Sequence, residues 1–138
     1  MPIIYDTLKV YEFLKTQGVD VPLNTSMKGI GFEQDGCLVA GVIYEGWNGW
    51  NVWMHVAAKA QSLGGARRFI RYAFEYPFDE WGAKRVSGYV NADNSKAIRL
   101  DEHLGFKRTN TLEGFGPNGQ SIFIYSMTRE ECRYVANS

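Results

Sequence analysis

The stretch Gln61-Ser62-Leu63-Gly64-Gly65-Ala66 separates two different apolar patterns. Residues 50–57, before it, are aromatic and apolar enough to form a buried strand. After it, apolar side chains recur at helical spacing, and arginines occupy the other faces: Ala66, Phe69, Ile70, Ala73 and Phe74, against Arg67, Arg68 and Arg71. Glycine lets a ligand approach the backbone closely, and the first N–H groups of a helix have no partner within it. The stretch therefore predicts a strand–loop–helix unit that binds a phosphate or pyrophosphate.

Length and composition limit the possible classes of protein. With 138 residues, 45% of them hydrophobic, the chain can bury one core, so we expect a single domain over residues 1–138. Lys plus Arg and Asp plus Glu number 15 each, which argues against nucleic acid as a partner. The remaining nucleic-acid hypothesis is binding of a single strand whose bases stack on Trp50 or Trp53. Because we find no leader-like segment and no apolar run of roughly 18 residues, we expect a cytoplasmic protein with no membrane partner.

The two cysteines suggest neither a disulfide nor a metal site. Cys37 opens an apolar run and is expected to be buried, whereas Cys132 lies in a polar tail. Two cysteines alone do not make a zinc site, and without a secretory context a disulfide is a minority outcome.

Apolar periodicity and turn residues predict an α/β layering around a mixed, mostly antiparallel sheet of about six strands. Asp6 caps a first helix that Gly18 ends, and Asp35-Gly36 is a strong hairpin signal. The helix after Ala66 is expected to stop near Pro77. The expected helices cover residues 6–17, 66–76 and 94–104, and the expected strands cover residues 28–34, 37–45, 50–57, 85–90, 106–113 and 121–128.

Two signatures in this order resemble the GNAT family of acetyl-CoA-dependent N-acetyltransferases. Gln61-x-x-Gly64-x-Ala66 matches the family loop, which has Gln or Arg, two residues, Gly, one residue, then Gly or Ala. Asn94-Ser95-Lys96-Ala97-Ile98-Arg99-Leu100-Asp101-Glu102-His103-Leu104-Gly105-Phe106 is similar to the last family helix, except at Asp101. With the flanking strands, the resemblance covers roughly residues 28–128. The first family strand is missing or reduced to residues 2–5.

The resemblance implies where acetyl-CoA, the co-substrate, would bind. It implies that the backbone of Gln61, Ser62, Leu63, Gly64, Gly65 and Ala66 holds the pyrophosphate, with added charge from Arg67 and Arg68. Met54, His55 and Val56 would pair with the pantetheine arm, where a bulge in the family splays the two central strands. A backbone N–H near Val56 would polarise the acetyl carbonyl. Asn94 would contact the coenzyme, cap its helix, or do both.

Direct transfer to an amine in a ternary complex requires a base, because a lysine-like ammonium has a pKa near 10.4. His55 is the first candidate, since a histidine ring titrates near neutrality, although a partly buried strand histidine is an equal alternative. Glu45 and Glu33 are the next candidates for the base, and His103 is expected to lie at the surface.

The acid that protonates the leaving thiolate is less clear from the sequence. Asp101 stands where many family members have a tyrosine acid, and we expect an ionised aspartate with no proton to give. Tyr89 could donate from the opposite side, or be a core tyrosine.

Trp47, Trp50 and Trp53 flank the expected acceptor side and would suit an apolar, cationic or peptide-like amine. The acceptor itself is not specified, and the chain could act as a monomer or a homodimer. The alternative to an enzyme is a non-catalytic or vestigial GNAT-like module that binds coenzyme A and regulates a partner. The reason for this alternative is that Asp101 stands where many family members have a tyrosine.

Overall fold

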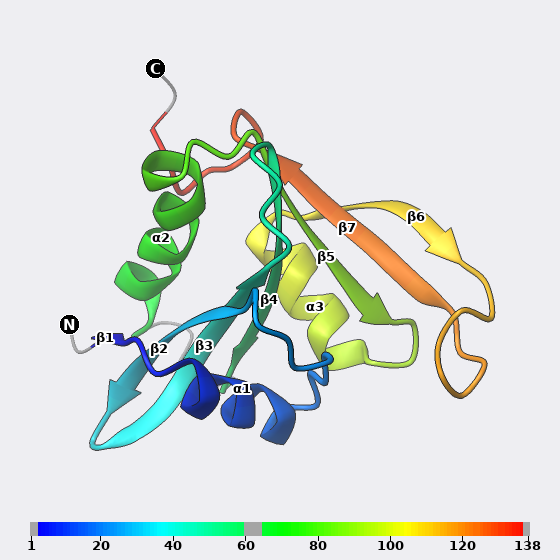
Figure 1. Ribbon diagram of the computed structural model, residues 1–138, viewed down its shortest axis with the longest axis horizontal. Helices are drawn as coiled ribbons and strands as arrows, with labels where there is room; N and C mark the ends of the chain where they lie inside the picture. Colours follow the sequence, from blue (N-terminus) through cyan, green and yellow to red (C-terminus); the bar gives the residue numbers. More distant parts are fainter. Residues whose placement is uncertain (1–2, 60–64, 137–138) are drawn as a thin grey trace.

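The computed structural model describes residues 3–59 and 65–136 (Figure 1). Its helices are α1 (Thr7–Thr16), α2 (Arg67–Glu75) and α3 (Ser95–Leu104), with a π-helical turn η2 (Tyr76–Glu80) after α2. Its strands are β1 (Ile3–Ile4), β2 (Lys28–Gln34), β3 (Cys37–Glu45), β4 (Asn51–Ala58), β5 (Arg85–Asn91), β6 (Lys107–Leu112) and β7 (Ile122–Thr128).

The seven strands form one sheet in the order β1-β2-β3-β4-β5-β7-β6. The β4–β5 pair is parallel and every other pairing is antiparallel, which confirms the expected mixed, mostly antiparallel sheet. One core lies under α2 and α3, and a second, smaller core lies under α1. Helices therefore cover both faces of the sheet.

Local sequence signals predicted the ends of most helices and strands to within one or two residues. The Asp6 side chain accepts from the Lys9 N–H and caps α1. Asp35 and Gly36 both have positive φ, at 53° and 81°, as a tight hairpin between β2 and β3 requires. The seventh strand is β1, two residues long, in the segment where a reduced first strand was expected.

The end of α2 differs from the expectation. The α-helix stops at Glu75, but the chain stays helical through Pro77 as the turn η2. Pro77 is tolerated because it lies at the start of that turn, where an N–H donor is not needed. The carbonyl four positions before it belongs to Ala73, and the buried Tyr44 hydroxyl donates to that oxygen at 2.5 Å. Tyr44 thus ties β3 to α2 and replaces the donor that proline lacks.

The two cysteines are placed opposite to the expectation. Cys37 is exposed, because it is the first strand residue after the hairpin, and Cys132 is buried. The C-terminal segment folds back on α2, with the Tyr134 ring stacked 4.9 Å from that of Phe74, and this covers Cys132. Within the described ranges, no helix is long and apolar enough to cross a bilayer.

We expect Tyr44→Phe to lower the free energy of unfolding by about 1–3 kcal/mol, because it leaves a buried carbonyl without its donor. Tyr76→Phe is the matched control, since Tyr76 lies in the same aromatic cluster and its hydroxyl has no hydrogen-bond partner among the described residues. Equilibrium urea unfolding measures both variants. Equal losses would mean that the Tyr44 hydroxyl does not stabilise α2.

Candidate functional site

The site is organised by the point where β4 and β5 separate. The two strands pair only from Asn51–Arg85 to Trp53–Ser87, and beyond that they diverge (Figure 1). A Cβ atom on Gly88 would lie 3.0 Å from the Met54 carbonyl oxygen, so glycine permits the close approach just where pairing ends. The expected splay is confirmed. The expected bulge is not found, because the β3–β4 register runs without interruption from Glu45–Trp53 to Ala40–Ala58.

A cavity of about 710 Å³ lies at this gap. Met54, His55 and Val56 of β4 line it, as do Tyr89, Val90 and Asn91 of β5. Met54, Val56 and Val90 belong to the core under α2 and α3, whereas Tyr89 packs against the core under α1. The cavity therefore reaches both faces of the sheet through the gap. Its other walls are the segment after α1, the start of α3, and the β6–β7 connection.

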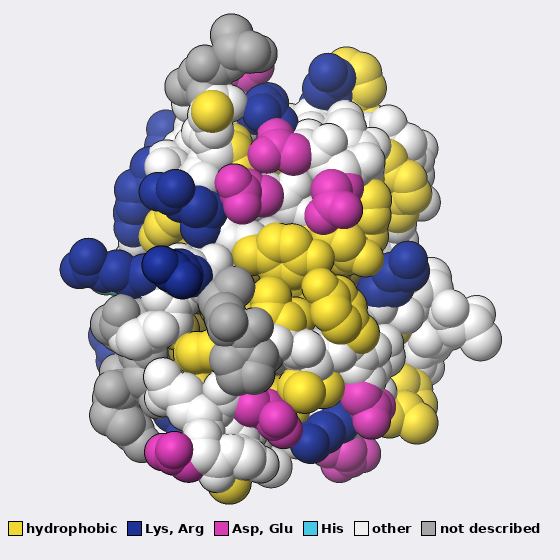
Figure 2. All heavy atoms as spheres, turned by 90° about the vertical axis from the view of Figure 1, so that its left-hand side faces the viewer, with side chains coloured by type: hydrophobic (Ala, Val, Ile, Leu, Met, Phe, Trp, Pro, Cys, Tyr) yellow, Lys and Arg dark blue, Asp and Glu magenta, His cyan; other side chains and the backbone are white. Residues whose placement is uncertain are grey.

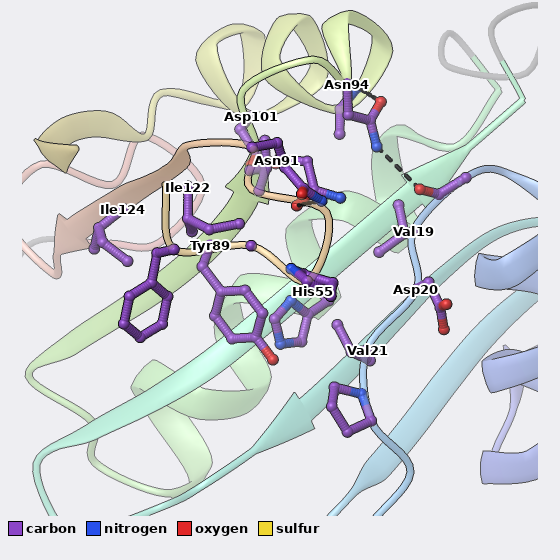
Figure 3. Close-up of a pocket in the computed structure, with 18 of the residues that line it drawn as sticks. Val19, Asp20, Val21, His55, Tyr89, Asn91, Asn94, Asp101, Ile122 and Ile124 are labelled. Atoms are coloured by element: carbon purple, nitrogen blue, oxygen red, sulfur yellow. Dashed lines mark hydrogen bonds between the residues drawn. The ribbon is translucent and has the colours of Figure 1, made fainter. Parts of the chain in front are cut away.

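The three side chains predicted to be catalytic meet at one carboxylate oxygen. Glu45 Oε2 lies 2.6 Å from His55 Nε2 and accepts a hydrogen bond from the Tyr89 hydroxyl at 3.3 Å. Glu45 Oε1 accepts from the Asn24 amide at 3.0 Å. Figure 3 shows the His55 and Tyr89 rings side by side in the cavity, and their centroids are 4.7 Å apart.

These contacts set the charge of the cluster. The hydrogen bond from His55 holds the pKa of Glu45 below its ordinary value, with smaller contributions from Asn24 and Tyr89. Burial, together with the Glu45 charge, raises the pKa of Tyr89 to about 12. Glu45 is therefore an anion at neutral pH, and Tyr89 is a neutral hydroxyl that donates to it.

The pKa of Asp101 contradicts the expectation that this residue is an ordinary ionised aspartate. It projects from α3, lines the same cavity, and is only 9% exposed. Burial, followed by the nearby Glu102 charge, raises its pKa from 3.8 to about 7. Sequence spacing could not show this, because the shift comes from the packing of α3 over the gap.

Asn94 caps α3, as one of its two interpretations predicted. Its side-chain oxygen accepts from the Ala97 N–H at 3.1 Å, and its amide donates to the Gly18 carbonyl at 3.0 Å (Figure 3). It also lines the cavity, so contact with the coenzyme stays a prediction.

The expected pyrophosphate loop is described only in part. Gln61, Ser62, Leu63 and Gly64 lie outside the described residues. Gly65 is exposed, and buried Ala66 precedes the first turn of α2, which has no acidic residue. Arg67, Arg68 and Arg71 line a second cavity of about 520 Å³ together with Arg133 and His103. On the face over α2, Lys and Arg side chains gather beside an area of hydrophobic side chains (Figure 2).

The remaining candidates are separated from the site. Glu33 pairs with Lys9 at 2.9 Å. His103 is at the surface, as expected, in the last turn of α3. Of the three tryptophans, Trp53 lies nearest the cluster, with its ring 5.7 Å from that of Tyr89, whereas Trp47 packs on Trp81 and Trp50 is 61% exposed.

Several residues of the site carried no signal in the sequence. Asn24 lies in a connector without periodicity, yet it orients Glu45. The β6–β7 connection contributes Phe115, Asn118 and Gln120, which the turn-rich composition marked only as a loop. Only the tertiary fold brings these segments to the gap.

Comparison with known proteins agrees with this geometry. The family model described as "Acetyltransferase (GNAT) family" matches residues 8–106. This chain belongs to the GNAT family of acetyltransferases. A search of curated proteins found no match.

Solved GNAT structures share the fold at low sequence identity. A point mutant of the spermidine N-acetyltransferase SpeG from Vibrio cholerae is 19% identical, with a TM-score of 0.65 over 90% of this chain and 75% of that one. A chimera of Vibrio cholerae SpeG and hSSAT is 14% identical, with a TM-score of 0.69 over 97% and 98%. A GNAT acetyltransferase from Bacillus anthracis is 15% identical, with a TM-score of 0.62 over 87% and 73%.

GNAT proteins take the acetyl group from acetyl-CoA, so this chain is an acetyl-CoA-dependent N-acetyltransferase. The gap between β4 and β5 suits acetyl-CoA as the donor. One edge of Met54–Ala58 has no strand partner in the described sheet, which leaves main-chain groups for the amides of a pantetheine arm.

We expect Asp101→Asn to stabilise the protein increasingly as the pH rises from about 4 to 7. Because the folded-state pKa is about 7 and the unfolded value is 3.8, the folded state holds a proton that the unfolded state has lost in this window. Ionisation therefore costs stability, with an upper limit on the order of 4 kcal/mol. Thermal unfolding of both proteins at pH 4 and pH 8 measures the difference.

Asp35→Asn is the control, because Asp35 lies on the exposed hairpin and Asn tolerates its positive φ. A stabilisation by Asp101→Asn that is the same at both pH values would show that the Asp101 carboxyl titrates normally.

Proposed function

We propose that this protein transfers the acetyl group of acetyl-CoA directly to a primary amine, with His55 as the base. The observation that carries the proposal is the convergence of His55, Tyr89 and Glu45 where the central strands part. The reacting groups would meet in the gap, so no covalent acetyl-enzyme is needed.

His55 is suited to receive the amine proton. Its Nε2 atom faces Glu45, which leaves Nδ1 as the second ring nitrogen. An anionic Glu45 stabilises the imidazolium that forms when Nδ1 takes the proton, and it fixes the orientation of the ring. Tyr89 and Asn24 in turn hold Glu45. Glu45 is therefore a positioning residue and His55 the catalytic base.

The coenzyme would extend from the gap toward the start of α2. Met54, His55 and Val56 would bind the pantetheine arm, and the first turn of α2 would face the pyrophosphate. The resemblance extends this seat back over Gln61, Ser62, Leu63, Gly64, Gly65 and Ala66. Arg67 and Arg68 would add positive charge, and neither forms an ion pair within the described structure.

The acceptor is inferred to be a cationic or neutral amine rather than an acidic one. Among the described residues that line the large cavity, Asp20 and Asp101 carry carboxyl groups, and none is Lys or Arg. Such a lining favours an ammonium group and disfavours a carboxylate. The SpeG structures with the same fold are spermidine N-acetyltransferases, which makes spermidine the first acceptor to assay.

The test of function is release of coenzyme A thiol from acetyl-CoA with spermidine, benzylamine, a lysine-containing peptide or glutamate as acceptor. We expect turnover with at least one of the first three and the weakest rate with glutamate. Binding of acetyl-CoA without turnover over the whole panel would instead support the regulatory alternative.

We expect acetyl-CoA to raise the melting temperature, since ligand at about 100 times its Kd adds about 2.7 kcal/mol. The Arg67→Gln/Arg68→Gln double variant should weaken binding about tenfold by removing charge beside the phosphates. Arg99→Gln is the matched control, because Arg99 is exposed on α3 and lines neither cavity. Equal affinity in all proteins would show that the phosphates bind elsewhere.

We expect His55→Gln to lower turnover by roughly 10²–10⁴-fold, the range for loss of a general base, with acetyl-CoA affinity nearly unchanged. Glu45→Gln should lower it less, since His55 remains. Measuring the rate from pH 6 to 9 separates the two roles, because only loss of His55 removes its limb of the profile. A His55→Gln enzyme with the parental rate and profile would refute the assignment of the base.

A further inference from the structure

The two carboxyl groups at the gap have opposite environments. Glu45, on the His55 side, is held by three hydrogen-bond donors and ionised. Asp101, on the α3 side, has no hydrogen-bond or ion-pair partner among the described residues, and it borders the same cavity. Two titratable groups whose surroundings favour opposite protonation states can divide acid and base roles between them.

Two causes favour the neutral form of Asp101, burial first and the charge of Glu102 second. Glu102 is the next residue on its own helix and is an anion that bonds to the Tyr125 hydroxyl of β7. His55 from β4, Tyr89 from β5 and Asp20 from the segment after α1 line the same cavity. No described Lys or Arg lies there to stabilise a carboxylate. Burial is thus the main cause, and the Glu102 charge adds to it although Arg108 pairs with Glu102 at 3.5 Å.

We propose that Asp101 is the general acid that gives its proton to the departing thiolate of coenzyme A, an inference that rests on the proposed function. Asp101 lines the cavity on the α3 side of the gap and His55 on the other side (Figure 3). A thioester seated in the gap would lie between the donor and the base.

The proton transfers balance over one catalytic turnover. The amine nitrogen bonds to the acetyl carbon, and its proton passes to His55. The carbon–sulfur bond breaks, its electron pair goes to sulfur, and the Asp101 carboxyl protonates that sulfur to give the free thiol. His55 then holds one extra proton and Asp101 lacks one, so a single transfer through water in the shared cavity restores both. Because the pKa of Asp101 is about 7 and that of a thiol roughly 8.5, the transfer to sulfur is downhill.

The first test needs no acceptor. It titrates the thiol of bound coenzyme A by the ultraviolet absorbance of the thiolate, in the parent protein, in Asp101→Asn and in the Asp35→Asn control. Above pH 7 an ionised Asp101 beside the sulfur repels the thiolate, so half-ionisation of the thiol should occur about one pH unit or more higher in the parent and control than in Asp101→Asn. Equal values in all three would overturn the inference.

The second test compares single-turnover rates from pH 6 to 9, with the acceptor that reacts fastest in the amine panel. Asp101→Asn should be slower by about 10²-fold at pH 6, the lower end for general acid catalysis, since a thiolate leaves readily. The difference should shrink toward pH 9, where the parent has also lost the proton. A constant ratio, or a loss confined to coenzyme affinity, would make Asp101 a binding residue and refute the proposal.

The two proposals fail separately in these tests. Absence of coenzyme A binding, or of turnover with every amine, refutes the proposed function and this inference with it. Binding and turnover that are indifferent to Asp101→Asn refute the acid alone.

Discussion

The separation of β4 from β5 is the constraint on which the other features of this structure depend. Three residue pairs hold the strands together at Asn51–Trp53, and the sheet then opens while β4 stays paired with β3 and β5 with β7. Each strand keeps one stabilising neighbour and leaves its other edge free. The free edges leave main-chain groups of β4 and β5 at the cavity, where an extended ligand can pair with them.

The opening also explains how two carboxyl groups with opposite pKa shifts come to lie around one gap. Because it passes through the sheet, it collects side chains from both faces, which a surface cleft could not do. On one face, Glu45 is charged because hydrogen-bond donors from three segments reach it. On the other, burial under α3 and the neighbouring Glu102 charge raise the pKa of Asp101 to about 7. Two carboxylic acids thus have pKa values shifted in opposite directions by their surroundings.

The features that local sequence could predict were those with local causes. The Asp6 and Asn94 caps and the turn at Asp35-Gly36 each depend on a few adjacent residues, and the structure confirms all of them. The bulge in β4 and the burial of Cys37 were wrong; α2 ends near Pro77 as expected, but a π-helical turn continues past it. The Tyr44 hydroxyl, distant in sequence, supports the helical turn at Pro77, whereas Cys37 is exposed because it directly follows the hairpin.

The amino-acid sequence by itself determined the family, the order of helices and strands, and the identity of the three polar side chains near the gap. Periodicity, caps and turn residues are short-range properties, and His55, Glu45 and Tyr89 follow from the ends of predicted strands. Only the tertiary structure decided that Glu45 joins His55 to Tyr89, that Asn24 holds it, and that Asp101 is buried without a side-chain partner among the described residues. The pKa of a side chain is set by its solvation and by neighbouring charges, and these neighbours come from segments that are distant in the chain.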